Sequence, residues 1–422
     1  MRFKINNIAK VEYADILLDG ITIVAGSNGS GKSTISKSLF AILYSNKDWR
    51  MKALSQKNRS INKVHSDFAV NNNIRQALRF MAYRNYLQRL EKISENYIKE
   101  KDKFINEIKN LSETMHIEIS HKESIEKLYM SLLEIENRGI EFYSKYAVQL
   151  AFSQIFINQI NTIGLGKSGE IIIEEDEEQF SVQFSKNLVE NMTKTDSLVS
   201  QSNPIYITTS DLNECVANDK QMYHLNIANG VSFANRELNN LLYKENDLSK
   251  LTAEMFEKMM WQKKEFESIV DEVVNGKLII EDQKLTFHDN WCNGTIEFSN
   301  IASGLKIFII LQRLISNGSF LDDSVLIIDE PETNLHPEWQ IKLAQLLVLL
   351  NKKIGLRMYL NSHSPYFVRA MEYFLHQYDI IEKCHFYFME ANEKNGMFQS
   401  KDVTEQLGII YDKLAEPFNL VM

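Results

Sequence analysis

The eight residues Gly26-Ser27-Asn28-Gly29-Ser30-Gly31-Lys32-Ser33 constrain this chain most, because they match G-x-x-x-x-G-K-[ST] at every fixed position. The apolar stretch Ile21–Ala25 precedes them, and a helix is expected from about Ser33. Glycines let successive backbone N–H groups turn inward without Cβ clashes, and a helix N-terminus adds its positive dipole end. The motif therefore predicts an α/β fold with a phosphate site between a strand and a helix.

Each residue of this loop has an expected role toward ATP. We expect Lys32 to reach the β- and γ-phosphates, Ser33 to ligate Mg²⁺, and Thr34 to hydrogen-bond the α-phosphate. The full set expected to bind nucleotide here is Gly26, Ser27, Asn28, Gly29, Ser30, Gly31, Lys32, Ser33 and Thr34. A chance glycine-rich turn is the alternative, and a second motif counts against it.

The second motif is the stretch Ser324–Asp329 with Glu330 and Pro331, in which four apolar residues predict a buried strand ending in two carboxylates. Asp329 is expected to hold Mg²⁺ through water, and Glu330 to act as general base on the attacking water. The alternative, a helix-capping turn, is disfavoured by a P-loop about 300 residues upstream. Together the motifs predict an ATPase.

Residues 329–337, with the strand 358–360 and Asn361-Ser362-His363-Ser364-Pro365, resemble the ABC-type ATPases related to RecF, SMC and OLD-type proteins. The resemblance implies that 334–337 form the dimer-interface D-loop and that His363 is the switch histidine, which contacts the γ-phosphate. A polar residue at the end of a strand beside the phosphates suits that role. It also implies a head-to-head homodimer or a higher oligomer.

In that family each site is completed by a signature loop from the other subunit, and residues 300–306 match it in order. Ser303 and Gly304 stand at the serine and first glycine, whereas Leu305 stands where a second glycine is usual. The contact across the dimer would then rest on Ser303, the Gly304 backbone and the helix N-terminus. The alternative is an ordinary helix capped by Ser303. Gln154 and Gln159 are only candidates for the Q-loop glutamine.

The rest of the chain divides into a head, residues 1–73 and 161–422, and a helical insertion at 74–160. Apolar residues between 86 and 111 step by threes and fours, and a second helical tract covers about 122–157. These tracts could fold back as a short coiled-coil-like hairpin about 60 Å long. Strands are expected at 2–25, 170–184, 203–208 and 278–298, and helix at 235–274. The predicted fold class is an α/β ABC-ATPase head, with a P-loop sheet flanked by helices and with antiparallel β hairpins.

Charge and composition narrow the classes of function. The net charge of -9 argues against a surface built wholly for nucleic acid, which stays an open partner. The cysteines Cys215, Cys292 and Cys384 are far apart, and no run of about 20 apolar residues occurs, so we expect a cytoplasmic protein without a membrane partner. Residues 47–64 are the most basic stretch, either a solvated loop or a phosphate-tracking one. The acidic run 174–178 indicates a charged hairpin turn rather than a metal site.

Three classes of ATPase remain, and the sequence ranks them by resemblance. A transporter ATPase is set aside because the insertion and the continuation after Glu330 depart from that branch. A RecF/SMC-like DNA repair or chromosome-maintenance ATPase is the alternative. The chain is most similar to the ATPase subunits of bacterial antiphage systems, the Septu PtuA-like group, in its compact length, modest insertion, residues 301–306 and residues 414–418. That resemblance implies a sensor and scaffold regulating a separately encoded nuclease effector.

A nuclease inside the chain is a further alternative. Only about 59 residues follow His363, which is enough to finish an ATPase sheet but short for an added catalytic domain. The insertion and the basic stretch 47–64 are the expected contacts for a partner or for nucleic acid.

Overall fold

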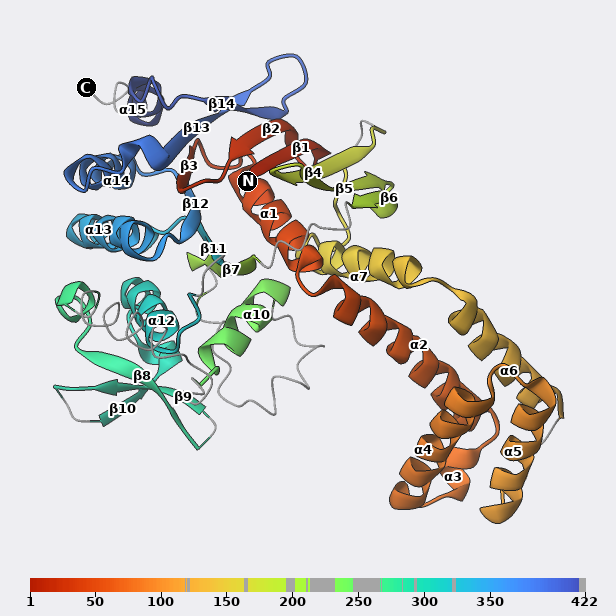
Figure 1. Ribbon diagram of the computed structural model, residues 1–422. Coiled ribbons are helices and arrows are strands. Elements are labelled where there is room, and N and C mark those ends of the chain that lie inside the picture. The colour runs from red at the N-terminus through yellow and green to blue at the C-terminus, as the bar shows by residue number, and fades with distance from the viewer. Residues whose placement is uncertain are drawn as a thin grey trace. The chain divides into compact units, whose positions relative to one another are not determined.

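The computed structural model describes residues 1–117, 119, 122–162, 166–194, 202–209, 212, 232–245, 266, 268–282, 284–291, 294–320 and 324–416. They belong to two compact units (Figure 1). Residues Met1–Lys47 and Leu150–Met422 form the unit that we call the head, and Asp48–Gln149 form the helical unit. The division therefore falls at 48 and 149 rather than at the expected 74 and 160.

An eleven-stranded sheet organises the described part of the head, in the order β6-β5-β4-β1-β2-β14-β13-β3-β12-β11-β7. The strands are β1 Arg2–Ile8, β2 Val11–Leu17, β3 Ile21–Ala25, β4 Gly169–Glu175, β5 Glu178–Ser185, β6 Leu188–Lys194, β7 Asn203–Thr208, β11 Ser324–Asp329, β12 Arg357–Ser362, β13 Cys384–Ala391 and β14 Phe398–Asp402. The strands expected at 2–25, 170–184 and 203–208 are confirmed. The residues after His363 complete this sheet through β13 and β14.

Five strands, β13, β3, β12, β11 and β7, run parallel to one another. Strands β3 and β11 are buried along their whole length, as their apolar runs predict for parallel strands covered on both faces. Parallel strands bring their carboxyl ends to one edge of a sheet. The residues that follow β3, β11 and β12, which are Gly26, Glu330 and His363, therefore share that edge.

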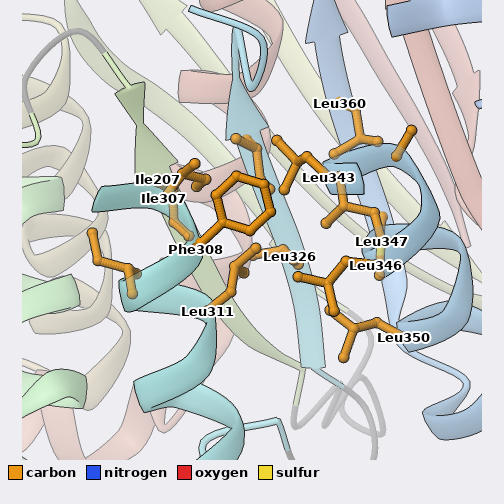
Figure 2. Packing of buried hydrophobic residues seen from close by; sticks show 14 of the residues in the cluster. Ile207, Ile307, Phe308, Leu311, Leu326, Leu343, Leu346, Leu347, Leu350 and Leu360 are labelled. Carbon is orange, nitrogen blue, oxygen red and sulfur yellow. The ribbon is translucent and has the colours of Figure 1, made fainter. Parts of the chain in front are cut away.

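The main hydrophobic core lies between this parallel sheet and helices α12 and α13. Figure 2 shows leucine and isoleucine side chains of β7, β11 and β12 packed between the two helices. Leu326 of β11, Phe308 and Leu311 of α12, and Leu347 of α13 belong to this cluster, and all four are fully buried. Burial of each leucine or phenylalanine side chain stabilises the fold by about 1.5–3 kcal/mol. This core thus fixes the position of the strands that carry the expected site.

Helices and a second sheet complete the described head. The helices are α1 Lys32–Asn46, α10 Phe233–Leu242, α12 Ser303–Ser316, α13 Pro337–Ile354, α14 Pro365–Gln377 and α15 Gly408–Ala415, with 3-10 turns η4 Phe298–Asn300 and η5 Ile381–Lys383. The antiparallel strands β8 Gly276–Glu281, β9 Lys284–Asp289 and β10 Gly294–Glu297 form the hairpin expected at 278–298. The expected helix at 235–274 begins as α10, and much of it lies outside the described residues.

The acidic run 174–178 forms the β4–β5 turn, as expected. Lys4 Nζ lies 2.8 Å from Glu174 Oε2, and Arg357 Nη1 lies 2.6 Å from Glu175 Oε1. In the part of the chain that the structure describes, no three His, Cys, Asp or Glu side chains gather as a metal group. Glu174 and Glu175 of this run therefore form ion pairs with Lys4 and Arg357.

The helical unit differs from the hairpin of two helical tracts that the periodicity predicts. Its helices are α2 Trp49–Asn71, α3 Ile74–Ala77, α4 Phe80–Tyr97, α5 Lys101–Thr114, α6 Lys122–Asn137 and the first part of α7 Ile140–Ile155. The tract expected as one helix is broken at Leu78 and Glu100, whose backbones are non-helical. At Glu100 the chain folds back because the apolar stripes of α4 and α5 can then bury each other, as Tyr86 and Phe104 do. Periodicity reports a buried face but not where a helix ends.

The basic stretch 47–64 is helical, so its interpretation as a loop is wrong. It forms most of α2, which buries Ala53, His65 and Phe68 in the helical unit. Lys57 Nζ of α2 lies 2.8 Å from Glu136 Oε2 of α6.

Within the described residues, no helix is long and apolar enough to cross a membrane.

Candidate nucleotide site

The P-loop connects β3 to α1 at the carboxyl edge of the parallel strands. Gly29 and Gly31 have φ angles of 77° and 90°, which place them in the left-handed backbone region that residues other than glycine rarely adopt. A Cβ on Gly31 would also lie 2.8 Å from Cγ2 of Val11. These positions therefore require glycine, and the loop that results fits the phosphate cradle expected for ATP.

Lys32, the first residue of α1, lies deep in the loop. Its Nζ donates to the carbonyl oxygens of Gly26 and Ser27, each at 2.8 Å. Burial lowers the pKa of the Lys32 ammonium, and the carboxylates of Glu330 and Glu332 oppose that shift. The Lys32 ammonium thus lies among acidic side chains at the carboxyl edge of the parallel strands, where the motif predicts that the nucleotide phosphates bind.

Asp329 is the most firmly held carboxylate of the site. Its Oδ1 accepts hydrogen bonds from Ser36 Oγ at 2.8 Å and from Asn361 Nδ2, and its Oδ2 accepts one from Tyr206 OH at 2.7 Å. Burial raises the pKa of the Tyr206 hydroxyl well above its usual value, and the Asp329 charge adds to the shift, so the hydroxyl remains a donor. These three donors hold the carboxylate in one orientation.

The expected magnesium ligands are Ser33 and Asp329, and their chemistry fits Mg²⁺, which prefers hard oxygen ligands and retains waters. Ser33 lies in the first turn of α1, and its carbonyl accepts a hydrogen bond from Ser36 Oγ at 3.2 Å. In the described residues Asp329 bonds Ser36 rather than Ser33. Ser36 therefore links the two expected ligands.

Glu330 follows β11 with a φ of 52°, which is unusual for a residue with a side chain. Its N–H donates to the Asn361 carbonyl at 3.0 Å, and Thr209 Oγ1 donates to its carbonyl at 2.7 Å. Thr333 Oγ1 donates to Glu330 Oε2 at 3.3 Å. The backbone is thus held in a strained turn that leaves the carboxylate partly exposed, as a general base requires.

His363 follows β12 and lies beside that carboxylate. Its Nδ1 is 3.4 Å from Glu330 Oε1 and 3.4 Å from Oε1 of Glu332, and its side chain is partly exposed. The fold therefore brings together Lys32, which begins α1, and Asp329, Glu330 and His363 at the ends of β11 and β12. Their roles toward ATP stay predictions.

The two signature residues lie at the start of α12, beside the turn that follows β11. Ser303 begins α12 and is exposed, and the preceding Ala302 makes no side-chain cap, so the alternative of a Ser303 cap is not what forms. A Cβ on Gly304 would lie 2.6 Å from the carbonyl oxygen of Asn334. In the described residues neither Ser303 nor Gly304 hydrogen-bonds the P-loop. Leu305, where a second glycine was expected, packs against the core.

Several site residues were not expected from the sequence. Tyr206 and Ser36 gave no usable signal, because one lies in an apolar strand and the other in an ordinary helix. Asn361 and Glu332 stand inside motifs that were recognised, and strand register decides their roles, since Asn361 pairs with Asp329. Gln154 accepts from Arg236 at 3.4 Å, and no described hydrogen bond joins Gln154 or Gln159 to the site.

A family model for the AAA ATPase domain matches residues 1–368, which include the P-loop, Asp329-Glu330 and His363. The chain belongs to the AAA ATPase domain family. It is therefore a P-loop ATPase by family. No curated protein matches the chain.

Solved structures give a weaker likeness. An SMC head bound to the C-winged helix domain of ScpA is 10% identical, with 97% of this chain and 98% of that one covered and a TM-score of 0.45. The SMC head domain from Thermotoga maritima is 10% identical, with 95% and 98% covered and a TM-score of 0.37. The ATP-binding cassette MJ1267 of an ABC transporter is 11% identical, with 99% and 96% covered and a TM-score of 0.33. At this level the likenesses assign no activity to the chain.

Proposed function

We propose that this ATPase is of the ABC type, works as a head-to-head homodimer or higher oligomer, and regulates a separately encoded nuclease in bacterial antiphage defence. The ATPase part is carried by one observation, the meeting of Lys32, Asp329, Glu330 and His363 at the carboxyl edge of β3, β11 and β12. The dimer part is supported by the resemblance of residues 300–306 and 329–337 to ABC-type ATPases, and the defence part by the resemblance of residues 301–306 and 414–418 to the ATPase subunits of antiphage systems.

The residues of one head divide the work of hydrolysis. Lys32 and the loop N–H groups bind the phosphates, while Ser33 and Asp329 would hold Mg²⁺, which would neutralise phosphate charge. Glu330 takes a proton from the water that attacks the γ-phosphate, and ADP leaves with inorganic phosphate. His363 contacts the γ-phosphate. Tyr206, Ser36 and Asn361 keep the Asp329 carboxylate in place.

The second head completes the site in this proposal. Ser303 and Gly304 of the partner subunit approach the γ-phosphate at the N-terminus of α12, where the helix dipole is positive. The exposed position of Ser303 is compatible with this contact. Neither head alone would then hydrolyse ATP efficiently.

Two variants of the site test hydrolysis and dimerisation. Lys32→Ala should lose ATP binding, because the loop loses its cation, whereas Glu330→Gln should bind ATP, stop turnover and accumulate the dimer, since only the base is removed. Binding is measured with a fluorescent ATP analogue, turnover by phosphate release, and assembly by light scattering. Equal turnover by wild type and Glu330→Gln would refute the role of Glu330.

The partner is tested with the full chain and its genomic neighbours. Native mass spectrometry of Glu330→Gln, co-expressed with the neighbouring gene products, should recover an ATP-dependent assembly with a nuclease. Recovery of a bare dimer with and without ATP would contradict the regulatory role. Metal-dependent cutting of DNA or RNA by the pure chain, surviving Glu330→Gln, would instead place the nuclease in this chain.

A second function, nucleic-acid binding as in a DNA repair or chromosome-maintenance ATPase, is favoured by the charge of the helical unit. Residues 48–92 contain ten Lys or Arg but three Asp or Glu, in a chain whose net charge is -9. The exposed basic side chains are Arg50, Arg59, Lys63, Arg75, Arg79, Arg84, Arg89 and Lys92. Positive charge clustered on exposed helices suits a phosphate backbone.

Fluorescence anisotropy with labelled duplex DNA and duplex RNA tests this second function. Changing Arg59 and Lys63 to Glu should weaken binding on the order of tenfold or more and flatten its dependence on salt concentration. The matched control changes the exposed Lys99 and Lys101 to Glu, because acids interleave with the basic residues there. Equal loss in both variants, or no binding by wild type, would reject a dedicated surface on α2.

A further inference from the structure

Glu332 is a buried carboxylate beside the site that the proposed chemistry does not use. Its Oε1 accepts three hydrogen bonds, from Ser362 Oγ at 2.7 Å, from the His363 N–H at 2.9 Å and from the Ser364 N–H at 3.2 Å. Its side chain is only 3% exposed. A buried carboxylate costs free energy unless it is well hydrogen-bonded, so its three bonds to consecutive residues define the strand end that carries His363.

Oε1 also faces the imidazole ring of His363. The same oxygen that binds the backbone lies 3.4 Å from Nδ1, and Glu330 Oε1 also lies 3.4 Å from that nitrogen. Nδ1 makes no hydrogen bond to either oxygen, so the two carboxylates limit the position of the ring by close contact.

Gln340 of α13 joins the same two segments a second time. Ser364 Oγ donates to Gln340 Oε1 at 2.9 Å, and Gln340 Nε2 donates to the Leu335 carbonyl at 3.2 Å. Glu332 and Gln340 thus both connect the turn after β11 to the turn after β12.

Burial raises the pKa of the Glu332 carboxyl, and its hydrogen bonds with Ser362 and the His363 N–H oppose that shift.

We propose that Glu332 is a positioning residue that fixes the backbone and the ring orientation of His363 beside the nucleotide site. The proposal rests on the function proposed above, because His363 is there the group that contacts the γ-phosphate. Glu332 acts through His363, since its Oε1 is occupied by the turn that carries that residue.

Steady-state kinetics of the full chain provides the first test. Glu332→Ala removes the oxygen that accepts all three hydrogen bonds. It should lower kcat on the order of 10- to 100-fold, while the Kd for ATP should change less than about twofold. Glu332→Gln retains an acceptor oxygen of similar shape, so it should restore much of the lost kcat. The control Glu338→Ala removes an exposed carboxylate from the same region and should leave kcat unchanged. Loss of ATP affinity with unchanged kcat would overturn the proposal.

A double variant decides whether Glu332 acts through His363. If it does, Glu332→Ala combined with His363→Ala should be no slower than His363→Ala alone. Multiplied losses would show an independent role and overturn the proposal while leaving the proposed ATPase mechanism intact. Unchanged kcat in His363→Ala would instead refute the proposed role of His363.

The ring itself gives a readout that needs neither ATP nor turnover. In protein labelled with ¹⁵N-histidine, long-range proton–nitrogen correlation spectra report the tautomer of each ring, and His363→Gln identifies its signals. Glu332→Gln should change the Nδ1 and Nε2 signals of His363 but not those of His65, which lies in the other unit. An unchanged His363 signal in both Glu332 variants would overturn the proposal, whatever the kinetics show.

Discussion

Replacing Gly304 with Ala should destabilise the head, because the start of α12 approaches the backbone after β11 closely. The added Cβ would lie 2.6 Å from the Asn334 carbonyl oxygen and 3.2 Å from Leu335 Cδ2. Real Cβ atoms essentially never come within 3.0 Å of another heavy atom, and a backbone oxygen cannot rotate away as a flexible side chain can. The turn containing Asn334 must therefore shift.

Overpacking of this kind costs about 1–3 kcal/mol, which for a head of this size lowers the melting temperature by about 2–4 °C. Differential scanning calorimetry of the full chain measures the shift. Gly408→Ala is the matched control: nothing lies within 4 Å of its added Cβ, and alanine favours the helix that begins there, so it should be neutral or stabilising.

The comparison with Ser303→Ala separates packing from the contact proposed across the dimer. Ser303 is exposed and caps nothing through its side chain, so Ser303→Ala should melt like wild type while weakening ATP-dependent dimerisation. If Gly304→Ala and Gly408→Ala both melted like wild type, the argument from the close approach to Asn334 would be refuted.

Three further results are expected. Tyr206→Phe should lower the free energy of unfolding by about 1.5–3 kcal/mol, because Asp329 Oδ2 loses a buried donor; the exposed Tyr366→Phe is its control, and equal melting temperatures would contradict the account. Burial lowers the pKa of His65 to about 4, so this residue favours the folded helical unit fully only above about pH 6.5, where the ring is neutral in both states. As the pH falls from 6.5 toward 4, the free energy of unfolding should drop by about 1.4 kcal/mol per pH unit. The melting temperature of His65→Gln should therefore depend less on pH between pH 7 and 5. Leu326→Ala should cost about 2–5 kcal/mol by leaving a cavity between α12 and α13, measured by chemical denaturation, and a loss below 1 kcal/mol would show that the core collapses around it.

The strand and loop elements of the head were largely predictable, whereas the helical unit was not. Runs of apolar residues predict buried strands such as β3 and β11. The P-loop is predicted by its glycines, which adopt backbone angles that other residues rarely adopt. Helical periodicity in 74–111 was real, but the breaks at Leu78 and Glu100 carry no proline or glycine. The break at Glu100 lets α4 and α5 bury apolar faces against each other, and a local pattern does not show where such packing ends a helix.

Prediction of the site had the same limit. Lys32, Asp329, Glu330 and His363 were found because motifs place them at strand ends, and parallel strands bring such ends to one edge. Tyr206 was missed because its role depends on β7 lying next to β11, far away in sequence.

The sequence by itself determined the local backbone of the phosphate loop, the carboxylates that end β11 and the membership of the ATPase class, because these depend on neighbours along the chain. Only the tertiary structure decided that Asn361 lies opposite Asp329, that Glu332 holds the turn of His363, and that Gly304 touches Asn334. Those contacts join segments distant in sequence, and the burial of one shared core sets the register in which they meet.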